Sequence, residues 1–245
     1  MKKIFITATD TDAGKTFISC AIISALTALH DKKVAAFKPV SAGCDLVNNT
    51  LVNEDAKWLT HYANCQQSIE QVNPIAFIEP IAPHIAARKV DQRITVAKVQ
   101  AEFTAVTSLN ADVTLVEGAG GWRLPLCMPT KEAPKAQFLA DFVSKEQLDV
   151  VLIVNMKLGC LNHALLTFEA IKAQGLNCVG WIANCASSEP MNNLTDNIDS
   201  LEQLLSAPKL GQVSFITDND SNGVSRTYQD KIALTQRKID VTALL

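Results

Sequence analysis

Residues Thr9-Asp10-Thr11-Asp12-Ala13-Gly14-Lys15-Thr16 decide the fold, because they join a short apolar run to a helical pattern. A phosphate-binding loop has a glycine at each end of four residues, followed by Lys and Ser or Thr; here Thr9 replaces the first glycine. The strand expected at residues 3–8 delivers this loop to a helix, whose free backbone N–H groups face the phosphates. Lys15 then reaches the β- and γ-phosphates, and the Thr16 hydroxyl ligates Mg²⁺. We therefore favour a triphosphate-binding loop over a chance Gly-Lys-Thr at a helix start.

Apolar runs and helical patterns alternate along the rest of the chain. Strands are expected at residues 3–8, 34–37, 113–116, 150–154, 178–183 and near Val213, and helices at residues 14–30, 53–64, 96–109, 137–145, 161–174 and 192–205. Strands that are apolar on both faces and separated by helices form a mainly parallel sheet covered on both sides. This pattern predicts an α/β fold, a P-loop NTPase-like three-layer arrangement. We expect a single domain over residues 1–245, with the irregular stretch 42–89 carrying function.

Composition narrows the class of protein. The chain of 245 residues is 48% hydrophobic with a net charge of −3, and it lacks a Lys/Arg block. This balance argues against a nucleic-acid partner, and no apolar run approaches the roughly 18 residues of a membrane span. The opening apolar run is too short for a secretion signal. Seven scattered cysteines without a C-x-x-C pair argue for reduced thiols and a cytoplasmic protein, and against a zinc site.

A carboxylate ends another expected strand, in Val113-Thr114-Leu115-Val116-Glu117-Gly118-Ala119-Gly120-Gly121. Proteins with a phosphate loop hold a metal-directed acid at such a strand end, and glycines after it let the backbone approach a ligand closely. The alternative is a turn with an exposed Glu117. We favour the metal-directed acid, because this strand is expected to run parallel to the first one.

Two further motifs have weaker signals. In Phe37-Lys38-Pro39-Val40-Ser41-Ala42-Gly43, Lys38 leaves a strand and is a candidate for stabilising a developing anion, although a surface lysine at a turn is equally compatible. Asn53-Glu54-Asp55 reads as a helix N-cap followed by acids that the helix dipole favours. Mg²⁺ prefers several oxygen ligands, and Thr16 with Glu117 leaves room for another, but the pattern alone does not make Asp55 a ligand.

Two later strand ends also carry polar groups. Met156-Lys157-Leu158-Gly159-Cys160-Leu161-Asn162 runs from a strand end to a helix start, where free N–H groups suit a carboxylate. An ordinary turn capped by Asn162 is the simpler interpretation. Trp181-Ile182-Ala183-Asn184 ends another strand; the Asn184 amide matches the edge of adenine, although turn-forming asparagines are commoner.

Taken together and in order, these motifs resemble the dethiobiotin synthase family over nearly the whole chain. The resemblance rests on T-D-T-D-A-G-K-T, K-P-V, E-D-A, P-H-I-A-A, V-E-G-A-G-G-W, K-L-G-C-L-N-H-A-L-L-T and W-I-A-N. It implies a homodimer of P-loop subunits that uses ATP and Mg²⁺ to close a ureido ring on 7,8-diaminononanoate and CO₂. A carbamate would attack the γ-phosphate, and the second amine would then displace phosphate.

The resemblance also implies roles for individual residues. Thr16, Asp55 and Glu117 would hold Mg²⁺, while Lys15 and Lys38 would neutralise the carbamate and the transferred phosphoryl group, with Thr11 close to the carbamate. The nucleotide would contact Asp12, Ala13, Gly14, Lys15, Thr16, Asp55, Glu117, Gly118, Ala119, Gly120, Asn184, Cys185, Ser214, Phe215 and Ile216. The diamine would contact Ser41 and Ala42, and its tail carboxylate would lie on Gly159, Cys160, Leu161 and Asn162 of the partner subunit.

Several positions depart from the family pattern. Ala42 stands where the family has Ser or Thr, and whether the preceding Ser41 substitutes for that hydroxyl is open. Ala8 and Ser214 replace a usual glycine and proline. None of these changes removes a charge that phosphoryl transfer needs. For His84, within P-H-I-A-A, we favour a structural role.

Two other classes of protein share parts of this pattern. A switch ATPase of the partition or septum-positioning type carries a second lysine early in its phosphate loop, where this chain has Thr and Asp. Such proteins often end in a basic amphipathic helix, and residues 229–245 lack a clear apolar stripe. A cobyrinic-type amidoligase would need a glutaminase domain for which this length leaves no room.

Overall fold

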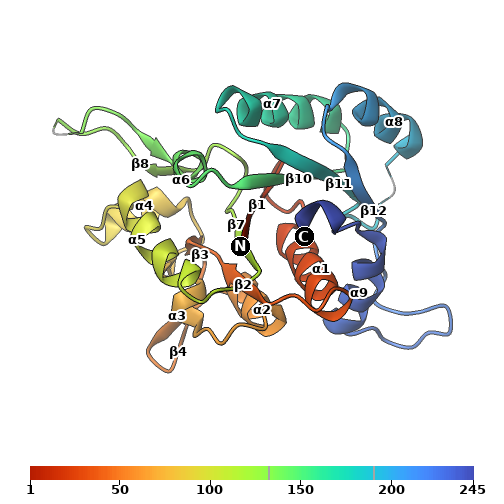
Figure 1. Ribbon diagram of the computed structural model, residues 1–245, viewed down its shortest axis with the longest axis horizontal. Coiled ribbons are helices and arrows are strands. Elements are labelled where there is room, and N and C mark those ends of the chain that lie inside the picture. The colour runs from red at the N-terminus through yellow and green to blue at the C-terminus, as the bar shows by residue number, and fades with distance from the viewer. Residues whose placement is uncertain (132, 190) are drawn as a thin grey trace.

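A parallel sheet forms the centre of the molecule (Figure 1). The computed structural model describes residues 1–131, 133–189 and 191–245. The 6-stranded sheet has the order β12-β11-β10-β1-β7-β2, and all neighbouring strands are parallel. Its strands are β1 (Lys2–Ala8), β2 (Val34–Phe37), β7 (Val113–Glu117), β10 (Asp149–Asn155), β11 (Cys178–Asn184) and β12 (Lys209–Val213). The predicted α/β fold is confirmed, and all the strand ends that carry motifs meet at one edge.

Helices cover both faces of this sheet. One face carries α1 (Lys15–Ala28), α2 (Glu54–Tyr62) and α9 (Tyr228–Thr235); the other carries α5 (Val96–Thr107), α6 (Leu139–Lys145), α7 (Cys160–Ala173) and α8 (Leu194–Leu204). Strand β1 explains the division, because successive side chains of a strand point to opposite faces. Ile4 and Ile6 join the α1 side of the core, and Phe5 joins the α5 side. Each such fully buried side chain stabilises the fold by about 1.5–3 kcal/mol.

The irregular stretch 42–89 is built from short elements around the strand ends. It contains β4 (Asp45–Val47), β5 (Thr50–Val52), α3 (Ile69–Val72), β6 (Ile75–Phe77) and α4 (Pro83–Lys89), and β3 (Val40–Ala42) pairs with β6 in parallel. Asn48 and Asn49 have positive φ values of 49° and 65°, which suits the tight turn joining β4 to β5. Asn53 caps α2 as predicted, since its side chain accepts from the Ala56 N–H.

Three local expectations are wrong or incomplete. Residues 137–145 begin with β9 (Gln137–Phe138), which pairs with β8 (Pro125–Cys127), and the helix α6 starts only at Leu139. Asn162 does not cap α7; the cap is Gly159, whose φ of 92° places it in the left-handed region. The tail forms α9 and the 3₁₀ turns η1 (Gln236–Lys238) and η2 (Thr242–Leu244), although its apolar pattern is weak. Ile232 anchors this segment in the core.

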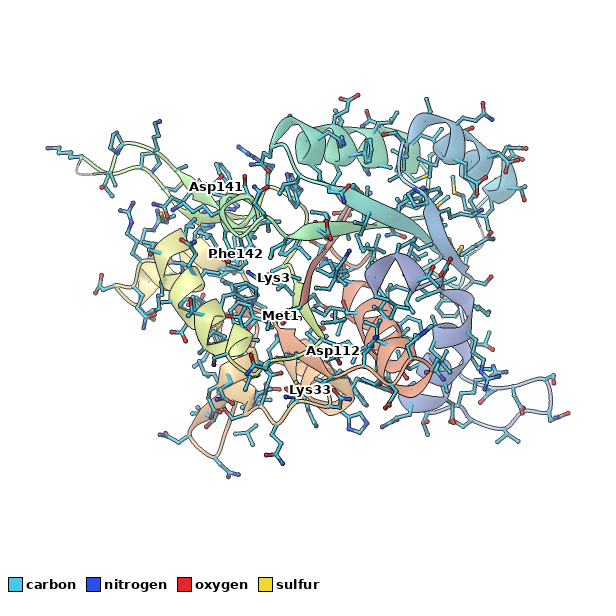
Figure 2. All side chains as sticks on the ribbon, viewed as in Figure 1. Met1, Lys3, Lys33, Asp112, Asp141 and Phe142 are labelled. Atoms are coloured by element: carbon cyan, nitrogen blue, oxygen red, sulfur yellow. The ribbon has the colours of Figure 1, made fainter. Side chains whose placement is uncertain are left out.

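Side chains fill the space between these layers, as Figure 2 shows. Lys3 forms an ion pair with Glu146 and lies over the Phe103 ring, which in turn meets Phe142 edge-on. All seven cysteines have free thiols. Among the described residues, no helix has the length and apolar character needed to cross a membrane.

Candidate nucleotide and metal site

The loop between β1 and α1 has the shape of a phosphate cradle. Gly14 is the N-cap of α1 with a φ of 77°, and Asp12 also has a positive φ of 57°. A Cβ atom on Gly14 would lie 2.4 Å from the Asn184 Nδ2 atom, so the position requires glycine. The same Nδ2 donates to the Ala13 carbonyl at 2.8 Å. Asn184, at the end of β11, therefore braces the loop.

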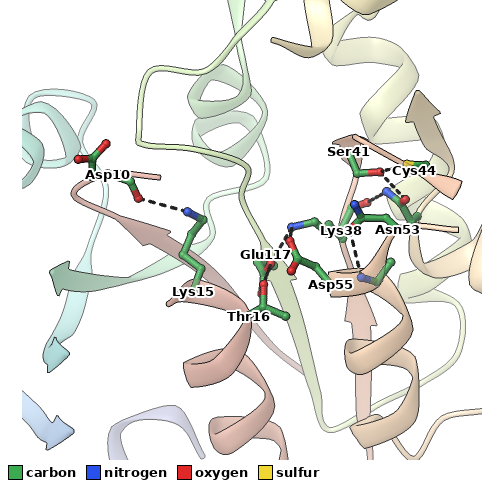
Figure 3. Close-up of polar contacts among 11 residues, drawn as sticks. Asp10, Lys15, Thr16, Lys38, Ser41, Cys44, Asn53, Asp55 and Glu117 are labelled. Atoms are coloured by element: carbon green, nitrogen blue, oxygen red, sulfur yellow. Dashed lines mark hydrogen bonds and ion pairs between the residues drawn. The ribbon is translucent and has the colours of Figure 1, made fainter. Parts of the chain in front are cut away.

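Lys15 is the first residue of α1 and is buried. Its ammonium donates to the Asp10 carbonyl oxygen at 3.5 Å, so the loop folds back over it (Figure 3). Burial lowers the pKa of Lys15, and the negative charge of Glu117 opposes this shift only in part. A phosphate in the loop would supply the counter-charge that this lysine lacks.

A buried cluster of charges lies beside the loop (Figure 3). Glu117 Oε1 is 2.6 Å from Lys38 Nζ and accepts from the Thr16 hydroxyl at 2.9 Å; Asp55 Oδ2 is 3.1 Å from the same Nζ. Lys38 is 3% exposed and Glu117 is 0% exposed. The alternatives of a surface lysine and of an exposed glutamate are therefore wrong.

The pKa shifts in this cluster follow from burial and pairing. Burial by itself lowers the pKa of Lys38, but the charges of Glu117 and Asp55 outweigh it and hold the pKa above its usual range. Burial likewise opposes ionisation of Asp55, and the Lys38 charge outweighs it, so the pKa of Asp55 is lowered. The cluster thus keeps the Lys38 ammonium charged although it is buried, and keeps the Asp55 carboxylate charged at the open edge of the site, where its side chain is 45% exposed.

The oxygen donors in this cluster suit Mg²⁺. Asp55 and Glu117 both pair with the Lys38 ammonium, and the Thr16 hydroxyl donates to the same Glu117 oxygen that Lys38 contacts. Glu117 Oε2 is buried and has no hydrogen-bond partner in the described part of the chain. An unpartnered buried carboxylate oxygen is costly, and a hard divalent cation would satisfy it. Residues 1–131, 133–189 and 191–245 contain no cluster of three or more His, Cys, Asp or Glu that could hold a metal. The set here instead combines a hydroxyl with carboxylates.

A cavity of about 710 Å³ joins the loop to the charged cluster. Residues predicted for phosphate, metal and substrate line it together: Thr11, Asp12, Gly14, Lys15, Thr16, Lys38, Ser41, Ala42, Asp55, Ala119 and Gly120. The Ser41 hydroxyl is buried and donates to Asn73 Oδ1 at 2.6 Å, and Asn73 also donates to the Lys38 carbonyl. The role of Asn73 could not be predicted, since nothing in its sequence neighbourhood marks it as functional.

A second cavity, of about 890 Å³, includes one of the predicted base-binding residues, Phe215, whereas Asn184, Cys185, Ser214 and Ile216 do not line it. Phe215 lines it together with Asn155 and Asp12, which also lines the first cavity. Ser214 is exposed, while Ile216 and Cys185 are half-buried. The two cavities thus meet at the phosphate loop.

The glycine-rich segment after β7 packs closely at its start. A Cβ on Gly118 would lie 2.9 Å from Phe5 Cζ, which is too close. Within the phosphate loop, the Ala13 side chain is buried, whereas Thr11 is exposed at the rim of the first cavity.

The turn at Gly159, Cys160, Leu161 and Asn162 lies apart from the first cavity, and none of these residues lines it. Lys157, just before the turn, pairs with Asp10 of the phosphate loop at 2.7 Å. Leu158, which lies between Lys157 and the turn, is 94% exposed. His84 also lies elsewhere, on α4 beside a smaller cavity of about 320 Å³; its structural role stays a prediction.

Comparisons with known proteins agree with this geometry. A family model described as an AAA domain matches residues 2–222. ATP-dependent dethiobiotin synthetase BioD of Alteromonas mediterranea is 42% identical over 223 residues, covering 89% of this chain and 94% of that protein. The enzyme of the same name from Pseudoalteromonas translucida is 40% identical and covers 96% and 99%, and that from Cellvibrio japonicus is 45% identical and covers 91% and 94%.

Solved structures are similar in fold alone. The septum site-determining protein MinD of Pyrococcus horikoshii, with Mg-ADP, aligns with a TM-score of 0.55 at 16% identity, covering 95% of this chain and 93% of that one. A ParA family ATPase of Chlorobium tepidum aligns at 0.53 and 16% identity, covering 96% and 91%. The fold and the loop define a P-loop nucleotide-binding protein. The chain belongs to the AAA-domain family and, more narrowly, to the ATP-dependent dethiobiotin synthetases.

Proposed function

We propose that this chain is a dethiobiotin synthase, which uses MgATP to carboxylate 7,8-diaminononanoate with CO₂ and close the ureido ring. The observation that carries this proposal is the position of Lys38. Its buried ammonium lies between Asp55 and Glu117 and lines the same cavity as Lys15, Thr16 and the phosphate loop. A phosphoryl acceptor in that cavity would meet cations on two sides.

The chemistry proceeds in three steps. One amine of the diamine adds to CO₂ and loses a proton, which gives a carbamate. A carbamate oxygen bonds to the γ-phosphorus of ATP as the bond to the ADP oxygen breaks. The second amine then attacks the carbamoyl carbon, and phosphate leaves as the ring closes, so the products are dethiobiotin, ADP and phosphate.

The residues contribute charge and position to these steps. Lys15 would contact the β- and γ-phosphates, and Lys38 would neutralise the carbamate and the transferred phosphoryl group, with Thr11 at the cavity rim donating to the carbamate. Mg²⁺, held by Thr16, Asp55 and Glu117, would offset charge on the phosphates. Asn184 would face the base from its position against the loop.

The diamine would lie along Ser41 and Ala42. Because the Ser41 hydroxyl is engaged with Asn73, we propose that it shapes the wall and that the Ala42 methyl group contacts the diamine. On this proposal the carbon chain of the substrate needs no hydrogen bond at position 42.

A homodimer would complete the site. The turn from Gly159 to Asn162 lies outside the cavity of its own subunit and offers N–H groups at the start of α7. We propose that it receives the tail carboxylate of a diamine bound to the other subunit, and that the exposed Leu158 lies in the contact. The free thiols fit a cytoplasmic enzyme.

A switch ATPase is the second candidate, and only the shared fold favours it. The reaction products distinguish the synthase from the switch ATPase. With carbon-13 bicarbonate, the diamine and MgATP, mass spectrometry should detect labelled dethiobiotin. Hydrolysis of ATP without any labelled product, and stimulated by lipid or DNA, would favour the switch instead.

A further inference from the structure

An aromatic cluster lies against the metal site and joins three separate parts of the chain. Tyr228, the first residue of α9, stacks on Trp58 of α2 with ring centroids 4.2 Å apart and planes at 29°. It also meets Phe17 of α1 edge-on, at 5.8 Å and 80°. All three rings are half-buried and pack against the core on the α1 side of the sheet.

The two partners of Tyr228 are neighbours of proposed metal ligands. Phe17 directly follows Thr16, and Trp58 lies one helical turn after Asp55, on the same side of α2. Burial raises the pKa of Tyr228, and the negative charges of Glu117 and Asp55 add to that shift. The Tyr228 hydroxyl therefore lies within the field of the metal-site carboxylates.

Helix α2 is short, and the aromatic contact with Tyr228 adds to its direct packing on α1. It has 9 residues, of which Ala56 and Leu59 are buried, and Asp55 is 45% exposed in its first turn. A helix of this length is marginal by itself, so the position of Asp55 depends on what packs against α2. An aromatic pair adds about 0.5–1.5 kcal/mol beyond the area it buries.

Helix α9 is itself firmly held. Thr227 and Asp230 form a capping box at its start, and Ile232 is completely buried. Lys231 of α9 also pairs with Asp218 at 2.6 Å. Helix α9 lies beyond residues 2–222, the part of the chain that the family model matches.

We propose that Tyr228 is a positioning residue for the metal: its ring, fixed by α9, sets the spacing between Thr16 and Asp55. The inference rests on the magnesium site of the proposed function. Thr16 and Asp55 come from different helices, and Tyr228 is the ring that touches both helices beside these ligands. Loss of the ring frees α2 to shift away from α1 and weakens metal binding without removing a ligand.

Binding of Mn²⁺, measured by electron paramagnetic resonance with saturating ADP, tests this proposal. Tyr228→Ala should raise the half-saturating Mn²⁺ concentration about tenfold, as loss of a supporting residue around a metal site typically does. Tyr228→Phe keeps the stacked ring and should bind as the wild type does. ADP affinity in EDTA should be equal in all variants, because the phosphate loop is unchanged. If Tyr228→Ala does not fold, Tyr228→Leu fills the volume without an aromatic face and is measured in its place.

Leu201→Ala is the matched control, since it removes a fully buried side chain of α8 on the opposite face of the sheet from α1, α2 and α9. Its Mn²⁺ binding should stay at the wild-type value. An unchanged Mn²⁺ affinity in Tyr228→Ala, or an equal shift in Leu201→Ala, would overturn the positioning role. Mn²⁺ binding with saturating ADP should be lost in Thr16→Val and in Glu117→Gln. Binding that survives in both of these variants would instead refute the proposed metal site.

Discussion

Lys38 Nζ lies 2.6 Å from Glu117 Oε1, and both side chains are almost entirely buried. Breaking one partner of a buried ion pair leaves an uncompensated charge, which is far costlier than losing the pair's own attraction. The pair connects the end of β2 to the end of β7, two neighbouring strands. It therefore holds the two sides of the site in register and keeps a cation beside the phosphate loop.

Replacing Lys38 should cost both stability and turnover. Lys38→Met should lower the free energy of unfolding by about 3–5 kcal/mol at neutral pH, because Glu117 is left buried and unpaired. Adding Glu117→Gln should recover most of that loss. Urea denaturation measures both effects, and an unchanged unfolding free energy in the single variant would contradict them.

The same lysine should matter for turnover more than for nucleotide binding. Lys38→Ala should retain ATP binding, since Lys15 and the loop hold the phosphates, while turnover falls by roughly 10²–10³. Calorimetric ATP titration and single-turnover kinetics separate the two effects. Equal turnover in the variant and the wild type would remove Lys38 from the mechanism.

Replacing Lys15 should raise the stability of the nucleotide-free protein, whereas replacing Lys38 should lower it. Its pKa is lowered from its ordinary value of 10.5, so the folded state holds its proton less tightly than the unfolded state does. Stability attributable to Lys15 therefore rises with pH through the lowered pKa toward 10.5. Lys15→Met should stabilise the nucleotide-free protein at pH 7, and the gain should shrink as the pH rises through that window.

Thermal unfolding across this pH range measures the Lys15 effect. Lys98→Met, at an exposed position of α5, is the control and should show no such pH dependence. Lys15→Met should also lose the stabilisation that ATP gives the wild type. A variant that is less stable than the wild type at pH 7 would refute the stated cost of burying this charge.

The glycines after Glu117 should differ sharply from one another. Gly118→Ala should destabilise the protein by about 1–3 kcal/mol and weaken MgATP binding, because its Cβ would press on the Phe5 ring and the Ile6 carbonyl. A Cβ on Gly121 would meet the Ala8 carbonyl at 3.6 Å, an ordinary contact. Gly121→Ala should therefore unfold as the wild type does, and equal losses in both variants would show that the packing argument fails.

The six strands of the central sheet and the longer helices between them were predictable from sequence, because each of these strands is a short apolar run, whereas the short elements β3 to β6, α3 and α4 were not. The phosphate loop and Glu117 were predictable for the same reason, since strand ends of a parallel sheet converge. The bond between Asn73 and Ser41 was not, because it joins residues whose local patterns carry no signal. Helix α9 was missed because its two buried residues, Ile232 and Thr235, do not form an apolar stripe.

Steady-state release of ADP tests the central claim most directly. With MgATP present, ADP release should require both 7,8-diaminononanoate and bicarbonate, and omission of either should reduce it to background. The coupled assay should also yield one dethiobiotin for each ADP. ADP release at the same rate with and without the diamine would contradict the assignment of this site to carboxylation and ring closure.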